Sequence, residues 1–280
     1  SQGSLEICKI LKEKGANVKA CNAQGQNALI IAIYKSNEFL KKHEKIEHQK
    51  LCFYLSDIGI DLDYVAPSGM TAFWAASIHK NLELCNYLLD KGVNPDVWHE
   101  IGLDGKMSAA HIWVNTSEVE IMRKILEKGG KLGQPDEFGN TVDAYGFLNP
   151  KMRNLMLEFN ADVNSMIYQK KDTKDTKINR IPVIYYIISE GNKQKDIVRE
   201  MIKRGARVTF EEEDLQKYEP IMIAIASNAY HVVQDLLETK KIDPNKLIKM
   251  NEYTASITAL MLTVSDVMNS KFALFMEKID

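Results

Sequence analysis

Short amphipathic segments recur along the chain, and each ends at the same kind of residue. In 82–94 (LELCNYLLDKGVN) and 5–18 (LEICKILKEKGANV), apolar residues recur every three or four positions and a glycine follows. This spacing predicts a helix, and glycine is a common residue just past a helix end because it tolerates positive φ. Further copies end at Gly129 and Gly205, and weaker ones occupy 154–164 and 232–237.

A second short apolar segment precedes these helices. The clearest spans 69–76 (GMTAFWAA), and 25–32 and 139–144 have the same order of residues. Thr or Asn before an apolar run predicts a helix N-cap, because its side-chain oxygen accepts a backbone N–H of the first turn. The chain is therefore expected to consist of helix pairs.

These segments resemble ankyrin repeats, whose pattern is G-x-T-P-L-H-x-A-A-x-x-G-x-L-E-x-V-x-x-L-L-x-x-G-A-x-V-N over about 33 residues. The residues expected at the end of each second helix are Gly15, Gly59, Gly92, Gly129, Asn160, Gly205, Lys241 and about Ile279. The resemblance covers nearly the whole chain. It implies an all-α solenoid of about seven to eight helix-turn-helix repeats with finger loops.

The spacing between repeats varies, so insertions are expected between the helices. They fall at about 36–49, 97–104 and 169–179, the last of which is polar and Lys-rich. A solenoid absorbs such insertions because each repeat contacts only its neighbours. We expect one ankyrin-repeat domain over 1–280. Since both ends look cut within a repeat, we expect it to be a piece of a longer protein.

The charge balance narrows the class of partner. Lys plus Arg number 36 and Asp plus Glu number 38, for a net charge of −2. A general nucleic-acid binder usually carries a basic surplus, so no nucleic-acid partner is expected. A hydrophobic content of 45% excludes wholesale disorder. No apolar run approaches the roughly 20 residues of a membrane span.

The cysteines and histidines have structural interpretations. Cys8, Cys52 and Cys85 each precede the glycine of their repeat by seven residues, a position that faces the core, where a thiol acts as a small apolar group. His111 occupies the motif's His position, and the resemblance implies a structural hydrogen bond. No metal-binding or nucleotide-binding motif is present, so no catalytic residue, metal or cofactor is expected. A catalytic role on the repeats would fall to Cys21 or His99.

The resemblance also implies where a partner binds, namely the concave side lined by the fingers and first helices. The adaptable positions of the motif, together with Trp98 beside them, are Gln24, Gln26, Tyr34, Lys35, Pro67, Ser68, Met70, Ile78, His79, Trp98, Lys106, Met107, Asn115, Glu137, Phe138, Asn140, Leu148 and Asn149. Met70, Ile78, Met107, Phe138 and Leu148 are apolar where a solvated finger is polar. For Trp74, Trp113, Met70 and Phe138, packing in the core is the alternative interpretation.

The leading hypothesis is a non-enzymatic module that binds another protein through this groove. The degenerate, insertion-rich repeats look similar to those of effectors that intracellular bacteria secrete, so the partner would be a host protein and the site of action the host cytoplasm. The alternative is the recognition arm of a larger effector enzyme whose catalytic domain lies outside 1–280. A cytoplasmic, monomeric protein is expected in either case.

Overall fold

Paired short helices make up the described parts of the chain. The computed structural model describes residues 2–35, 42–101, 105–168, 180–210 and 219–245. Their contacts divide the chain into two units, Ser1–Glu137 (unit 1) and Phe138–Asp280 (unit 2). Each unit is described by itself.

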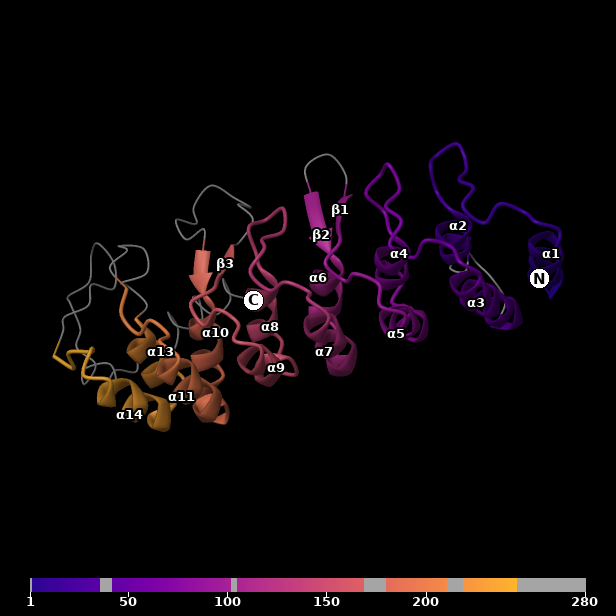
Figure 1. Ribbon diagram of the computed structural model, residues 1–280. Helices are drawn as coiled ribbons and strands as arrows, with labels where there is room; N and C mark the ends of the chain where they lie inside the picture. The colour runs from indigo at the N-terminus through magenta and orange to yellow at the C-terminus, as the bar shows by residue number, and fades with distance from the viewer. Residues whose placement is uncertain (1, 36–41, 102–104, 169–179, 211–218, 246–280) are drawn as a thin grey trace. The chain divides into compact units, whose positions relative to one another are not determined.

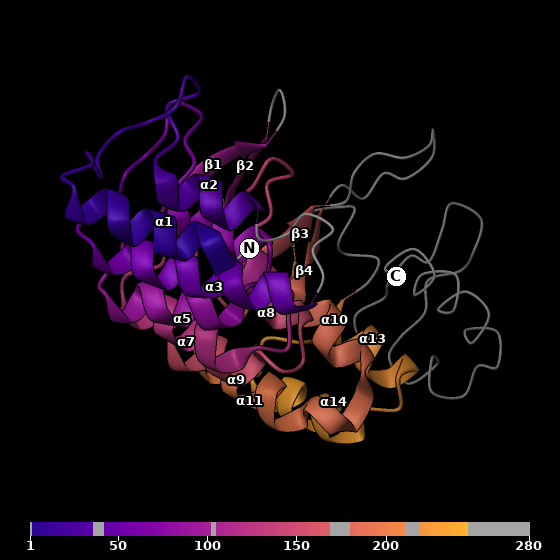
Figure 2. The same ribbon diagram turned by 90° about the vertical axis from the view of Figure 1, so that its right-hand side faces the viewer.

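Unit 1 begins with a lone helix and continues with three helix pairs. Its elements are α1 (Gln2–Glu13), α2 (Ala28–Lys35), α3 (Lys42–Asp57), α4 (Ala72–Ile78), α5 (Leu82–Asp90), β1 (Trp98–Ile101), β2 (Gly105–Ser108), α6 (Ala109–Val114) and α7 (Val119–Glu127). The first helices α2, α4 and α6 form one layer and the second helices α3, α5 and α7 form the other (Figures 1 and 2). The fingers project from the first-helix layer (Figure 2).

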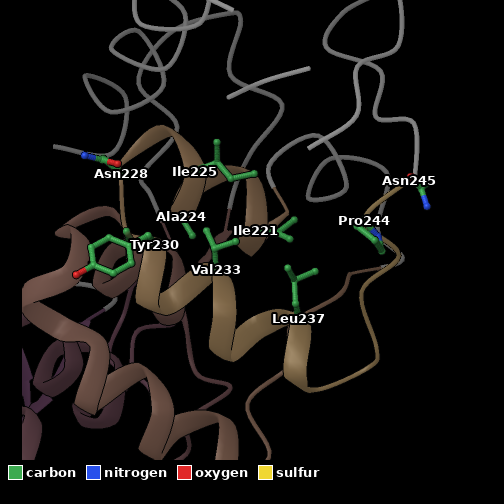
Figure 3. Close-up of a pocket in the computed structure, with 10 residues that line it drawn as sticks. Ile221, Ala224, Ile225, Asn228, Tyr230, Val233, Leu237, Pro244 and Asn245 are labelled. Atoms are coloured by element: carbon green, nitrogen blue, oxygen red, sulfur yellow. The ribbon is translucent and has the colours of Figure 1, made fainter. Parts of the chain in front are cut away.

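Unit 2 repeats this plan with three further pairs. Its elements are α8 (Val142–Leu148), α9 (Arg153–Glu158), β3 (Met166–Tyr168), β4 (Arg180–Pro182), α10 (Val183–Ser189), a 3-10 turn (Gly191–Gln194), α11 (Lys195–Lys203), α13 (Pro220–Ala226) and α14 (Tyr230–Glu238). α8 packs on α10 and α10 on α13, while α9 and α14 both contact α11. α13 and α14 border a hollow of about 430 Å³ (Figure 3).

Side-chain caps begin the first helices where the sequence predicts them. Thr71 accepts the backbone N–H of Trp74 at 3.1 Å, and Thr141 accepts that of Ala144 at 3.3 Å. These bonds satisfy amide groups that have no partner within the helix. The predicted helix starts are confirmed.

The second helices end at a residue with positive φ, as predicted. Gly15, Gly59, Gly92, Gly129 and Gly205 have φ between 84° and 97°, and Asn160 has 55°. The last described position is Lys240, with φ 56°, so the expectation of Lys241 was wrong by one residue. The structure thus describes seven of the expected repeat ends. The one near Ile279 lies outside the described residues.

The insertions take different forms. Residues 42–49 extend α3 to 16 residues, against 9 in α5 and α7. Around 97–104 the finger becomes an antiparallel hairpin in which Trp98 pairs with Ser108. Residues 36–41, 102–104 and 169–179 lie outside the described residues, although β3 and β4 on either side of the third insertion pair with each other.

The core is built from equivalent positions in successive repeats. The position seven residues before the helix end, called the −7 position below, holds Cys52, Cys85, Met122 and Val198, each 0% exposed. The predicted packing role of these thiols is confirmed, whereas Cys8 on the end helix α1 is only half-buried. Trp113 is also buried, which confirms the core interpretation, and its indole N–H donates to Ser77 Oγ at 3.0 Å.

Candidate protein-binding surface

The finger before α2 positions the first two candidate residues. Asn22 Oδ1 accepts the backbone N–H groups of Gln24 at 3.0 Å and Gln26 at 2.9 Å, which closes the turn. The Asn22 amide also donates to Gln26 Oε1 at 3.0 Å. Gln24 is therefore presented to solvent, whereas Gln26 is half-buried and holds the finger in shape.

The next finger packs against this one. The Pro67 ring lies so close to Gly25 that a Cβ at Gly25 would overlap it, and the Tyr64 hydroxyl donates to the Gly25 carbonyl at 2.8 Å. Pro67 and Ser68 remain exposed. Contact between the fingers fixes their positions before any partner arrives.

The ends of α2 and α4 bring together three further candidates. The Tyr34 and His79 rings meet edge to face at 5.2 Å between centroids, and Ile78 beside them is 41% exposed. Burial raises the pKa of Tyr34 and lowers that of His79, so His79 is neutral at pH 7. Within the described part of the chain, His79 Nε2 is buried without a hydrogen-bond partner. Lys35 is exposed nearby on α2.

An aromatic cluster fixes the base of the β1–β2 hairpin. The Trp74 indole donates to the Met107 carbonyl at 3.2 Å, and its ring packs on His99 at 4.0 Å. Trp74 is 2% exposed, which confirms the packing interpretation over the interface one. Trp98 meets the His111 ring at 5.2 Å, so Trp98 and Met107 are both half-buried.

The remaining unit 1 candidates lie at exposed points. Lys106 on β2, Asn115 at the end of α6 and Glu137 at the end of the unit are exposed. The Asn115 amide donates to the His111 carbonyl at 3.1 Å, as part of the helix end. These residues border the surface, and their side chains supply polar groups to it.

Two candidates are not available to a partner. Met70 is only 8% exposed and Asn140 only 5%. Asn140 Oδ1 accepts the Tyr168 backbone N–H at 2.6 Å, and its amide donates to the Tyr168 carbonyl at 3.3 Å. The assignment of Met70 and Asn140 to the binding surface is therefore corrected, because Met70 is buried in the core and Asn140 pins the next finger.

Unit 2 instead exposes two aromatic side chains on neighbouring fingers. Phe138 is 43% exposed, which favours the interface interpretation over the core one, and Tyr168 on β3 is 41% exposed. The Tyr168 ring lies over Gly139, the residue after Phe138. The sequence reasoning missed Tyr168. Its position in the finger of the sixth repeat, one repeat beyond the positions considered, was the signal that could have found it.

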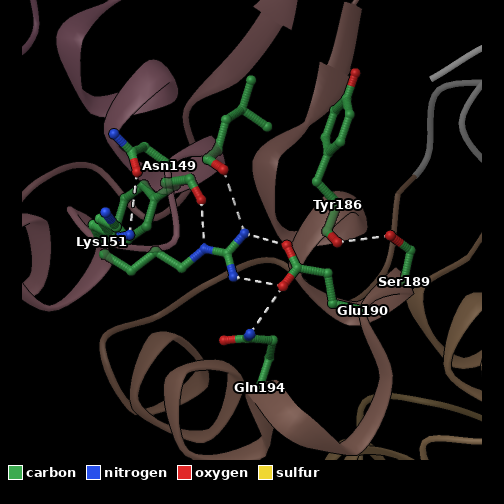
Figure 4. Close-up of polar contacts among 9 residues, drawn as sticks. Asn149, Lys151, Tyr186, Ser189, Glu190 and Gln194 are labelled. Carbon is green, nitrogen blue, oxygen red and sulfur yellow. Dashed lines mark hydrogen bonds and ion pairs between the residues drawn. The ribbon is translucent and has the colours of Figure 1, made fainter. Parts of the chain in front are cut away.

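The last two candidates, Leu148 and Asn149, lie at the end of α8, where the buried Arg153 holds the backbone and pairs with the partly exposed Glu190 (Figure 4). Arg153 is 2% exposed and donates to the carbonyls of Phe147 at 2.7 Å and Leu148 at 3.4 Å. Its guanidinium also forms a bidentate pair with Glu190. Leu148 and Asn149 are consequently half-buried and rigidly placed.

Two buried cysteines and His111 have structural roles, whereas Cys21 is exposed. Burial raises the pKa values of Cys52 and Cys85 to about 12, which keeps both thiols protonated at neutral pH. His111 Nδ1 shares a hydrogen bond of 2.8 Å with Ser108 Oγ, which confirms its predicted structural role. Across the described ranges, no three His, Cys, Asp or Glu side chains converge as metal ligands would.

The second-helix layer presents a charged exterior. Lys91 pairs with Asp57 at 2.7 Å and Lys124 with Asp90 at 3.0 Å, each linking one repeat to the next. The Lys91 ammonium and the Tyr87 hydroxyl lower the pKa of Asp57 below its usual range. Salt bridges this exposed add little stability.

Stacked helix pairs with projecting fingers define the class of the protein, a repeat solenoid. The sequence model of the family described as "Ankyrin repeat" matches residues 68–99. The solved ankyrin repeat domain of Bcl-3, a member of the IkappaB protein family, has 18% sequence identity and a TM-score of 0.53, with 89% of this chain and 99% of that domain covered. The described part of the chain has the ankyrin-repeat fold, as its sequence predicted.

Ankyrin-repeat domains serve in general as non-catalytic modules for protein–protein interaction, and this chain has the fold of such a module. None of its described helices combines the length and apolar character that crossing a bilayer requires.

Proposed function

We propose that the chain binds a partner protein through two patches on the finger and first-helix side, one in each unit. The unit 1 patch is Tyr34, Ile78 and His79. The unit 2 patch is Phe138 and Tyr168.

The distribution of exposed apolar side chains carries this proposal. Ten large apolar side chains are exposed among the described residues. Val65, Ile78, Phe138 and Tyr168 lie on fingers or at the end of a first helix, five lie on the end helices α1 and α14, and one lies on α3. Within the described residues, α5, α7, α9 and α11 expose none of them. From Val65 to α11, the exposed large apolar side chains of the described residues therefore lie on the finger side, where a partner can bury them.

The exposed fraction of each patch side chain sets how much binding free energy its burial can contribute. Fully burying an Ile or Phe side chain is worth about 1.5–3 kcal/mol. Because Ile78 and Phe138 are each a little over 40% exposed, each would add about 1 kcal/mol, or about fivefold in affinity. Rigid placement by neighbouring fingers keeps the entropy cost of ordering these side chains low.

Site-specific photocross-linking tests the proposal while the partner is still unidentified. A photoreactive residue replaces Ile78 or Phe138, and matched controls place it at Glu120 on α7 or Lys203 on α11, which are exposed on the opposite layer. We expect the two patch positions to capture one and the same protein and the controls to capture none of it.

Binding of the captured protein, once purified, then gives the decisive measurement. Ile78→Asp and Phe138→Asp should each raise Kd at least fivefold, whereas Glu120→Ala should leave it unchanged. Met70→Ala is unsuitable because Met70 is buried. Equal capture at the control positions, or an unchanged Kd in the Ile78→Asp, Phe138→Asp double variant, would show that the partner binds elsewhere.

The proposal also covers where the module acts. We propose that it is a monomeric, cytoplasmic effector that acts on a host protein. Its support is the degenerate, insertion-rich style of the repeats, and the recognition arm of a larger effector enzyme is the alternative. The full reading frame discriminates between them, since a frame with no catalytic domain beyond these repeats would remove the alternative.

A further inference from the structure

The hairpin that carries Tyr168 is short. The described part of its ladder pairs three residues of β3 with three of β4, and Tyr168 with Arg180 is the outermost pair. A small two-stranded hairpin is marginally stable in water, and the ends of such elements open most readily. A contact outside the ladder is therefore needed to hold Tyr168 in one position.

Asn140 supplies this contact from the preceding repeat. Its side chain is 5% exposed, its Oδ1 accepts the Tyr168 backbone N–H at 2.6 Å, and its amide donates to the Tyr168 carbonyl at 3.3 Å. The same amide donates to the Tyr145 hydroxyl at 3.3 Å. Burial of an amide side chain is costly unless such bonds are made. Here two of the bonds fix the backbone of an exposed patch residue.

The residues equivalent to Asn140 are of a different kind. Each stands directly before the N-cap of a first helix, and the described ones are Gln26, Met70, Met107 and Ile181. Gln26 Oε1 accepts from Asn22 in its own finger, and Met and Ile side chains carry no amide. The amide of Asn140 thus departs from its equivalents in the repeat that precedes the Tyr168 finger.

Two residues beside Asn140 complete the support. Gly139 has φ 86°, and a Cβ there would lie 3.3 Å from the Tyr168 ring, so the missing side chain lets the ring lie against the finger backbone. Asp143 is 3% exposed, and its Oδ1 accepts the backbone N–H of Asp162 at 3.2 Å, in the chain that leads into β3. The equivalents of Asp143 are the buried apolar residues Leu29, Phe73 and Ala110.

We propose that Asn140 is the positioning residue of the unit 2 patch and raises affinity for the partner by holding Tyr168 ready to bind. The inference rests on the proposed function and adds a residue that acts through Tyr168, because Asn140 itself is buried. A side chain ordered before binding spares the complex the cost of ordering it. Such ordering corresponds to about two- to tenfold in Kd.

Amide exchange in the full chain tests the positioning without a partner. Asn140→Met removes the amide and places there the residue that the chain has at two equivalent positions, and Asn140→Ala repeats the test with a smaller side chain. The Tyr168 amide should exchange about tenfold faster or more. Nuclear Overhauser contacts between the Tyr168 ring and Gly139 should weaken, while amides within α8 keep their rates. Unchanged exchange at Tyr168 in a folded variant would overturn the proposal.

Asn192 provides a matched control. It also bonds to the backbone of the following repeat, since its amide donates to the Asn228 carbonyl at 3.3 Å and its Oδ1 accepts the His231 N–H at 3.1 Å. Asn192→Met should leave exchange at Tyr168 unchanged. Equal acceleration in this control would mean that a general loss of stability causes the effect, which would also overturn the proposal.

Binding of the protein captured at the Phe138 position gives the second measurement. Asn140→Met should raise its Kd about two- to tenfold in the otherwise unmodified chain and should have no further effect once Tyr168→Ala is present. An equal effect with and without Tyr168 would show that Asn140 does not act through it. If Tyr168→Ala alone left Kd unchanged, the proposed function would fail at this residue, and amide exchange would still decide the positioning.

Discussion

Arg153 offers the sharpest test of how unit 2 is held together. It occupies the −7 position before Asn160, where other repeats bury Cys, Met or Val, and it is 2% exposed. Arg153→Met keeps a side chain of similar length in the core and removes the guanidinium. The Phe147 and Leu148 carbonyls and Glu190 then lose their donor.

The expected loss in free energy of unfolding comes from the groups that lose the Arg153 guanidinium. A buried carbonyl left without a donor costs about 1–3 kcal/mol, and the Phe147 bond of 2.7 Å is the stronger of the two. Glu190 is 38% exposed, so water replaces its partner and its loss adds only about 1 kcal/mol. The Leu148 bond is long, at 3.4 Å, and only partly buried, so its loss adds little, and the Phe147 and Glu190 contributions sum to a loss of about 2–4 kcal/mol. This loss lowers a urea midpoint by about 1–2 M for a typical dependence on denaturant.

Urea unfolding followed by two signals measures this loss. All three tryptophans, Trp74, Trp98 and Trp113, lie in unit 1, whereas far-ultraviolet circular dichroism reports helix content in both units. The dichroism midpoint should fall, and the fluorescence midpoint shows how far the destabilisation spreads.

A matched control is Arg199→Met, which breaks the more exposed pair with Asp235 and should produce a much smaller shift. If Arg153→Met left the midpoint unchanged or raised it, the guanidinium would be replaceable by apolar packing and the reasoning would be wrong.

Three further outcomes are expected. Burial raises the pKa of Asp143 to about 6 from 3.8, so its native form holds the proton more tightly than the unfolded chain does, and stability falls as pH rises from about 4 to 6. Asp143→Asn should therefore stabilise the protein at pH 7 by up to about 3 kcal/mol, with little effect at pH 4, in urea unfolding at both pH values. Alkylation with iodoacetamide at pH 8 should modify exposed Cys21 rapidly and Cys52 only on unfolding, as peptide mass mapping would show. Gly25→Ala should lower the melting temperature more than Gly15→Ala, since both have positive φ but only Gly25 abuts another residue; equal shifts would contradict the role of finger contact.

The fold was predictable because its signals are local. Thr71 and Thr141 cap helices through their own side chains, and a glycine such as Gly92 ends them through its own backbone freedom. Lys240 shows the limit of this reasoning. A lysine with positive φ has no sequence signature that separates it from the lysine beside it, and the expected repeat end was one residue late.

The candidate surface was less predictable because contacts between repeats decide exposure. In the sequence, Asn140 resembles a solvated finger residue. In the structure, its side-chain amide is hydrogen-bonded to the backbone of Tyr168, 28 residues later. Arg153 looks like a surface charge, yet it is buried because Glu190 neutralises it and two carbonyls accept its N–H groups. Position in the repeat predicts which side a residue lies on, while its accessibility depends on the side chains of the next repeat.

In the β1–β2 and β3–β4 hairpins, the residues that anchor the strands differ from the residues that connect them. The indole of Trp74 holds β2 near the base of β1–β2, and the side-chain amide of Asn140 holds Tyr168, the residue of β3 that pairs with Arg180. Both anchors bond to residues of the paired strands themselves. Evolution can therefore lengthen or rewrite those connecting stretches without disturbing the stack, which makes them natural entry points for new specificity and for grafted recognition sequences.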